Sequence, residues 1–177
     1  MKKFLVLLVA FLLAASSWGA LADTTLMGNG FQMTLGEGWS ILDAASQANV
    51  SQLASGMAPA GACMAVSENG ASLCAYIQPS QGMNIQFMEL FQSEYVWRIE
   101  EAIAPIQAEN VSGAQTLCGA NNVYCLSFTA AGVPVAVYYS FSSESVVTAI
   151  FTNAESEEMA QILSTLSIQE TAPLPQP

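Results

Sequence analysis

The four cysteines are the side chains of this 177-residue sequence best suited to covalent or metal chemistry. The first 22 residues have the pattern of an export signal, and an even number of cysteines behind such a signal is typical of disulfides. Zinc or redox chemistry is the alternative, but the sequence has no Cys-x-x-Cys motif and no histidine, so we favour disulfides. Four cysteines allow three pairings, and we predict the two local ones because each flanks a strong turn signal: Cys63–Cys74 and Cys118–Cys125.

The first predicted disulfide requires a particular hairpin register. A two-residue loop at Asn69-Gly70 would leave Cys63 and Cys74 on a diagonal, about 7–8 Å apart, which is beyond easy disulfide reach. A four-residue loop over 67–70 would place the two cysteines directly opposite each other. We therefore predict the longer loop, with Gly70 supplying a positive φ.

The second predicted disulfide fits a tight turn at Asn121-Asn122, because asparagine tolerates left-handed backbone geometry. That turn would place Cys118 directly opposite Cys125. Each disulfide would stabilise the fold by about 2.5–3 kcal/mol through the loop that it closes.

Acid–base chemistry is suggested only by the adjacent carboxylates of Glu100 and Glu101. Neighbouring residues on a helix do not face each other, and Arg98 lies at ion-pair spacing from both Glu94 and Glu101, so surface ion pairs explain the cluster. Without histidine the sequence lacks the commonest general base and the usual Ser-His and Cys-His nucleophiles. We therefore predict no catalytic residue.

Binding motifs are equally sparse. The sequence has no P-loop, no dinucleotide fingerprint, no G-x-S-x-G and no EF-hand loop, so we predict no cofactor and no dedicated metal site. A weak calcium site built from scattered carboxylates stays open. Trp39, Trp97 and Tyr138 could line a ligand groove, although aromatic residues in strands and amphipathic helices are more often core, which is the reading we favour.

The first 22 residues have the pattern of a secretory signal peptide: Lys2 and Lys3, an apolar run over 4–15, and small residues before the cut. We predict cleavage after Ala22 and an exported protein, periplasmic or secreted. The alternative, a retained membrane anchor, is disfavoured because a span needs about 20 apolar residues.

Charge then constrains the partner. Loss of Lys2 and Lys3 leaves Arg98 as the one basic residue against 14 acidic residues, a net charge of −13. Such a surface disfavours nucleic acid and anionic lipid. It is compatible with a basic partner, or simply with solubility.

Period-two alternation predicts an antiparallel meander. Phe31, Met33 and Leu35 mark the first strand, and short turns join those that follow. The other predicted strands cover 39–42, 62–67, 71–78, 106–117 with a break at 112–113, and a hairpin series through Tyr124, Leu126 and Phe128, then 133–141 and 146–151.

Helical spacing predicts a long helix that Asn84 caps and that Pro105 ends. Its expected apolar stripe is Phe87, Met88, Phe91, Tyr95, Ile99 and Ile103.

Two further helices complete the predicted domain. Asp43 would cap a weak helix over 44–55. Acidic residues open a last helix from Glu155 to about Leu166, which buries Met159, Ile162, Leu163 and Leu166. We expect one domain over 23–170 and a proline-rich tail without fixed structure over 171–177.

The order of these segments resembles the PsbP-like fold, which includes bacterial exported proteins similar to DcrB. The resemblance is carried by GFQMTLGEGW, NIQFMELFQSEYVWRIEEAIA, VYCLSFTAAGVPVAVYYSFSSESVVTAIFT and AESEEMAQILSTLSI. It implies an α+β sandwich, an antiparallel sheet covered by helices, and mostly non-catalytic accessory or binding roles. The chain departs from DcrB-like lipoproteins because its first cysteine, Cys63, lies far beyond the cleavage site and offers no lipid anchor.

These observations favour an exported, non-enzymatic binding or accessory protein of the cell envelope or of a secreted complex. Two alternatives stay open: a histidine-independent carboxylate hydrolase, and a structural surface or adhesion component. The sequence identifies neither the partner nor the oligomeric state.

Overall fold

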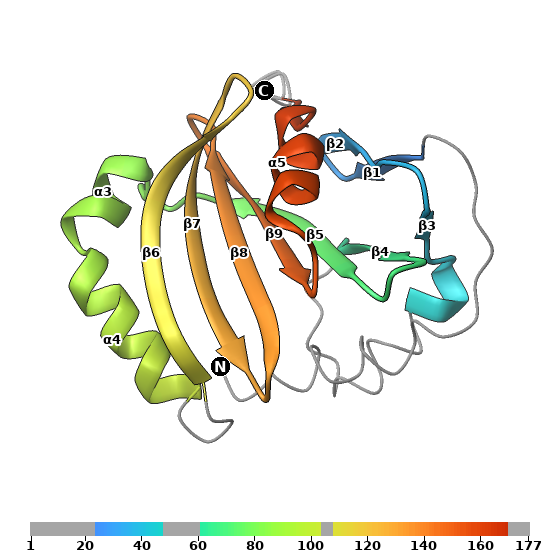
Figure 1. Ribbon diagram of the computed structural model, residues 1–177. Coiled ribbons are helices and arrows are strands. Elements are labelled where there is room, and N and C mark those ends of the chain that lie inside the picture. Colours follow the sequence, from blue (N-terminus) through green and yellow to red (C-terminus); the bar gives the residue numbers. More distant parts are fainter. Residues whose placement is uncertain (1–23, 48–60, 104–107, 170–177) are drawn as a thin grey trace, which may run out of the picture.

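Most of the protein consists of antiparallel strands, as the alternation of apolar and polar residues predicted. The computed structural model describes residues 24–47, 61–103 and 108–169 (Figure 1). Its large sheet has the order β3-β4-β5-β9-β8-β7-β6. The strands are β3 (Trp39–Ile41), β4 (Cys63–Ser67), β5 (Ser72–Pro79), β6 (Ala108–Cys118), β7 (Asn121–Ala130), β8 (Val133–Phe141) and β9 (Ser145–Thr152).

A small second sheet joins the beginning and the end of the described chain. β2 (Phe31–Thr34) pairs with β1 (Thr25–Gly28) on one side and with β10 (Ser167–Ile168) on the other. Phe31, Met33 and Leu35 are buried, which confirms the predicted alternation.

Helix α5 (Ser156–Ser164) covers one face of the large sheet together with the small sheet (Figure 1). It buries Met159, Ile162 and Leu163, and Leu166 follows them into the core, as predicted. Trp39 and Tyr138 also lie in this core, each in edge contact with the ring of Phe151. We call this side the α5 face.

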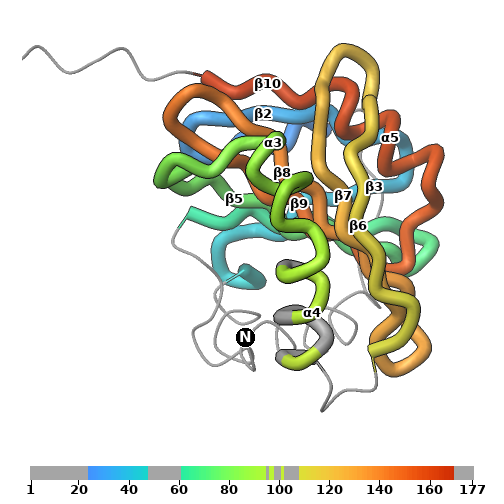
Figure 2. Tube along the Cα trace, turned by 90° about the vertical axis from the view of Figure 1, so that its left-hand side faces the viewer, coloured from blue at the N-terminus to red at the C-terminus, as the bar shows by residue number. Residues whose placement is uncertain are grey.

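The opposite face of the large sheet carries the second core, which includes Leu126, Phe128, Val135 and Val137, as the alternation predicted. Helices α3 (Ile85–Leu90) and α4 (Gln92–Ile103) lie beside β6, the edge strand (Figures 1 and 2).

The predicted long helix is thus two helices that meet at Phe91. The Asn84 cap is confirmed, since its Oδ1 accepts a hydrogen bond of 2.9 Å from the amide of Phe87. The predicted apolar stripe is partly wrong, because Met88 is buried while Phe87 and Phe91 are 41% and 42% exposed.

The predicted register of the first hairpin is wrong by one residue. Ser67 donates its amide hydrogen to the Ala71 carbonyl, so the loop has three residues, 68–70, and Gly70 has φ of +81°. Cys63 therefore lies opposite Ala75, and Cys74 lies opposite Met64. Neither the predicted four-residue loop nor the two-residue alternative forms.

The predicted register of the second hairpin is also wrong. Cys118 pairs with Asn121, so the turn is at 119–120 rather than at the two asparagines. Cys125 lies opposite Ala114, four positions farther along. The irregularity in β6 falls at Asn110 and not at 112–113, and Asn110 has φ of +57°.

Several predicted segments lie outside the described residues: the signal peptide 1–22 with its cut after Ala22, most of the weak helix, and the tail 171–177. The start of the weak helix is described. Residues 44–47 are helical, and Asp43 Oδ1 accepts a hydrogen bond of 2.7 Å from the amide of Ser46.

Candidate functional site

The four cysteines are free thiols in this structure, and the registers explain why the predicted pairs do not meet. Cys63 packs with the α5 face, whereas Cys74 packs with the opposite face. Cys63 lies opposite Ala75, the neighbour of Cys74, and adjacent residues of a strand point to opposite faces of the sheet. Cys118 and Cys125 share a face, but four residues of strand, about 13 Å, separate their levels. That separation exceeds the reach of a disulfide.

The environment of the thiols is that of packing residues. Burial raises the pKa of each thiol, and most strongly that of Cys74, to about 12. A raised pKa keeps the thiol protonated and unreactive at neutral pH. Cys63 Sγ is 3.1 Å from the Met27 carbonyl oxygen, to which it can donate.

The aromatic candidates are divided between the core and an exposed helix. Trp39 and Tyr138 are core residues on the α5 face, as the favoured reading predicted, whereas Trp97 is 57% exposed on α4. Glu101 is exposed on the same helix. Within residues 24–47, 61–103 and 108–169, no three cysteine, aspartate or glutamate side chains are close enough to hold a metal ion.

An exposed apolar surface on the two neighbouring helices is the first site that the structure adds. Phe87, Leu90, Phe91 and Trp97 form what we call the α3–α4 surface, and they are 41%, 77%, 42% and 57% exposed. The rings of Phe87 and Phe91 lie 4.6 Å apart between centroids, with an interplanar angle of 39°. Most large apolar side chains of a small domain are buried, so four exposed ones on and between two adjacent helices are unusual.

Helices α3 and α4 attach to the sheet through other side chains than those of the α3–α4 surface. Met88 and the half-buried Val96 face the sheet. Gln92 lies four residues from both Met88 and Val96. Its side-chain amide donates a hydrogen bond to the Gly113 carbonyl oxygen. Gly113 lets Tyr124 approach β6, since a Cβ there would overlap the tyrosine hydroxyl. Along the same helices, Leu90 is largely exposed, and Phe87 and Phe91 are partly exposed.

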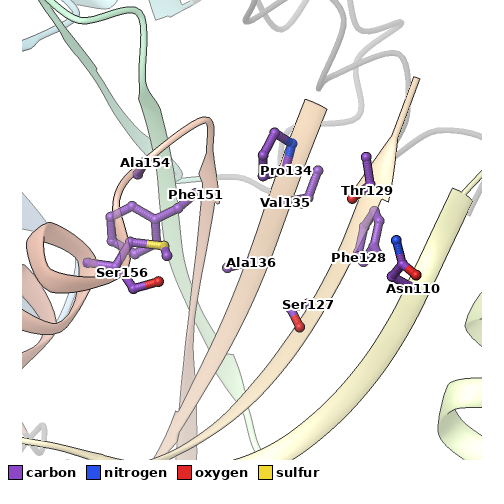
Figure 3. A pocket seen from close by; sticks show the side chains of 11 residues that line it. Asn110, Ser127, Phe128, Thr129, Pro134, Val135, Ala136, Phe151, Ala154 and Ser156 are labelled. Carbon is purple, nitrogen blue, oxygen red and sulfur yellow. The ribbon is translucent and has the colours of Figure 1, made fainter. Parts of the chain in front are cut away.

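A cavity of about 270 Å³ beside the start of α5 is the second site. Figure 3 shows Phe151, Ala154 and Ser156 near α5, and Asn110, Ser127, Thr129 and Phe128 toward β6. The described lining residues are Asn110, Ser127, Phe128, Thr129, Pro134, Val135, Ala136, Phe151, Ala154, Ser156 and Met159.

A β-bulge brings Asn110 into this lining. Asn110 and Val111 together oppose Phe128, because the pairing passes from Glu109–Thr129 to Ser112–Ser127. Such a bulge re-aims side chains, and asparagine is one of the few residues that readily adopt a positive φ. The cavity therefore gains an amide from an edge strand.

Side-chain hydrogen bonds at both ends of α5 position this helix, which forms the wall of the cavity opposite β6. Near its start, Glu158 Oε1 accepts a hydrogen bond of 2.6 Å from Trp39 Nε1. At its end, Asn121 Nδ2 donates to the carbonyl oxygens of Leu163 and Leu166, at 2.9 and 3.0 Å. These contacts join residues 42–119 positions apart, so no local pattern in the sequence could predict the cavity.

Comparisons with known proteins find similarity at the level of structure. No known family model and no curated protein matches the sequence. The solution structure of cyanobacterial PsbP (CyanoP) from Synechocystis aligns with a TM-score of 0.51 and 13% identity, over 86% of this chain and 98% of that one.

A crystal structure from Bacteroides thetaiotaomicron aligns with a TM-score of 0.50 and 10% identity, over 85% of this chain. The chain spans about half, 50%, of that protein's length. In the described part of this chain, no helix is long and apolar enough to cross a membrane. With its antiparallel sheets and flanking helices, the chain has the PsbP-like α+β fold that its sequence predicted.

Proposed function

We propose that this chain is an exported, non-enzymatic accessory protein that binds a protein partner through the α3–α4 surface. The observation that supports the proposal most directly is the exposure of Phe87, Leu90, Phe91 and Trp97 on adjacent helices. Exposed apolar clusters of this kind are typical of interaction sites, and aromatic residues are enriched in the cores of protein interfaces.

The charge around the surface specifies the partner further. Helices α3 and α4 carry four glutamates and one arginine, Arg98, a net charge of 1 − 4 = −3, and Glu89, Glu94 and Glu101 are exposed. An apolar centre with an acidic rim matches a partner with an apolar pocket and lysine or arginine around it. The same rim opposes docking on anionic lipid, so a protein partner is favoured over a membrane.

A capture experiment with matched variants tests the proposal. The tagged protein is recovered from its own exported fraction with bound proteins, beside the double variant Phe87→Ser, Phe91→Ser and the control Met27→Ser. Met27 is 67% exposed but lies on β1, away from α3 and α4. We expect a partner that the control retains and that the double variant loses at least tenfold.

Salt provides a second measurement, because screening weakens the attraction between the acidic rim and a basic partner. We expect the partner's association rate to fall between 50 and 500 mM salt. Identical capture by the double variant and the wild type, or a catalytic activity that depends on one acidic residue, would contradict the proposal.

A further inference from the structure

The cavity beside α5 lies away from the α3–α4 surface and is not explained by a docking role. It is bounded by β6, β7, β8, β9 and the first turn of α5, whereas the exposed aromatic residues lie on α3, on α4 and at the residue between them (Figures 1 and 3). Its volume of about 270 Å³ is just below the range of about 300–1,000 Å³ that is usual for drug-sized ligands. The occupant is therefore about as large as a single ring.

The hydrogen-bonding groups of the cavity are hydroxyls and an amide. Asn110, Ser127, Thr129 and Ser156 line it, and their side chains can each both donate and accept. Ser127 Oγ is 2.9 Å from Ser112 Oγ. Within the described part of the chain, the side chains of the other three form no hydrogen bond, so they are available to a ligand.

Most apolar groups of the cavity lie toward α5 and β8, while Phe128 lies beside Thr129 and Asn110 (Figure 3). Met159 and Ala154 come from the α5 side, and Ala136 and Pro134 come from β8 (Figure 3). A ligand must therefore present one apolar side to these groups and one hydrogen-bonding edge to Asn110 and Thr129.

The charge of the site favours a neutral ligand. The described lining contains no acidic or basic side chain. Glu155 and Glu157 flank Ser156 in the chain, and their charges offset the positive end of the α5 dipole, which would otherwise attract an anion. A phosphate or carboxylate group therefore has no complementary charge here.

From this lining we infer that the cavity binds a small uncharged polyol ring, with the chemistry of a single pyranose sugar. The ring hydroxyls donate to and accept from Asn110, Ser127 and Thr129 at one edge, and from Ser156 at the α5 side. The C–H face of the ring packs against Met159, Ala154 and Ala136. The inference is independent of the partner-binding surface, because no residue is shared between the two sites.

The test is a titration of the ¹⁵N-labelled protein with D-glucose, 4-methylphenol and inorganic phosphate, followed by amide chemical shifts. We expect glucose to give saturable shifts centred on Ser127, Thr129 and Ser156. Two variants should each weaken glucose binding at least tenfold. Ala136→Leu fills the cavity, and Asn110→Gly removes the amide while keeping a residue that tolerates a positive φ.

Each variant has a matched control. Ala44→Leu makes the same change at an exposed site, and Gln81→Gly removes an amide at another positive φ, +53°. Should Ala136→Leu fail to fold, Asn110→Gly still decides the question. The inference is overturned by the absence of saturable glucose shifts, by unchanged binding in the variants, or by phosphate or 4-methylphenol binding at the cavity when glucose does not.

Discussion

The α5 face and the α3–α4 surface come from helices with similar sequence patterns, yet only one of them closes over its apolar residues. Helix α5 buries Met159, Ile162 and Leu163 and is held at both ends by side-chain hydrogen bonds. Helices α3 and α4 bury Met88 but leave a row of large apolar side chains exposed. Helical spacing therefore identifies an apolar stripe, while long-range contacts decide whether the protein or a partner covers it.

The two regions should differ most in how much the free energy of unfolding falls when an aromatic ring is removed. Phe151 is fully buried between Trp39 and Tyr138, so Phe151→Ala should lower the free energy of unfolding by about 3–5 kcal/mol. Trp97→Ala, on the exposed helix, should change it by no more than about 0.5 kcal/mol. Urea denaturation of both variants measures the contrast, and equal losses would mean that Trp97 is covered within the protein.

The sequence was sufficient where local rules determine structure. Alternation located β2, β7 and β8 and assigned their buried faces, and the Asn84 cap and the α5 core were identified from spacing alone. The PsbP-like α+β fold followed from the order of these elements.

The sequence was insufficient where several local solutions are nearly equal. Gly70 can close loops of two, three or four residues, and the three-residue loop places Cys63 and Cys74 on opposite faces. The helices beside β6 are attached through a contact between Gln92 and Gly113, and the cavity is lined by residues from five elements. Nothing in the spacing of these residues specifies such contacts.

An intermediate effect is expected at the end of α5. Asn121→Ala removes the donor to the carbonyl oxygens of Leu163 and Leu166, and leaving such partly buried acceptors unpaired costs about 1–3 kcal/mol. Asn122→Ala is the matched control, because the neighbouring side chain is exposed. Thermal and urea unfolding should separate the two variants. Equal stabilities would show that α5 does not depend on this contact and would weaken the contrast with α3 and α4.

The last effect concerns the two faces of the large sheet, and it is absent at neutral pH. Burial raises the pKa of Cys74 to about 12 in the folded protein, against about 8.5 in an unfolded chain. The folded state therefore keeps a proton that the unfolded state loses. The resulting stability is complete below about pH 8.5 and is lost at up to about 1.4 kcal/mol per pH unit as the pH rises toward 12.

Comparing Cys74→Ala with Cys63→Ala between pH 8 and pH 10.5 isolates this contribution, because other titrating groups are common to both variants. Cys74→Ala should flatten the fall in stability with pH, whereas Cys63→Ala should flatten it less, since Cys63 is only partly buried. Slopes equal to that of the wild type in both variants would mean that neither thiol titrates. A disulfide between them would instead make the fall steeper in both variants than in the wild type, because either substitution frees the other thiol; it would require the β4–β5 register to shift by one residue in the exported protein.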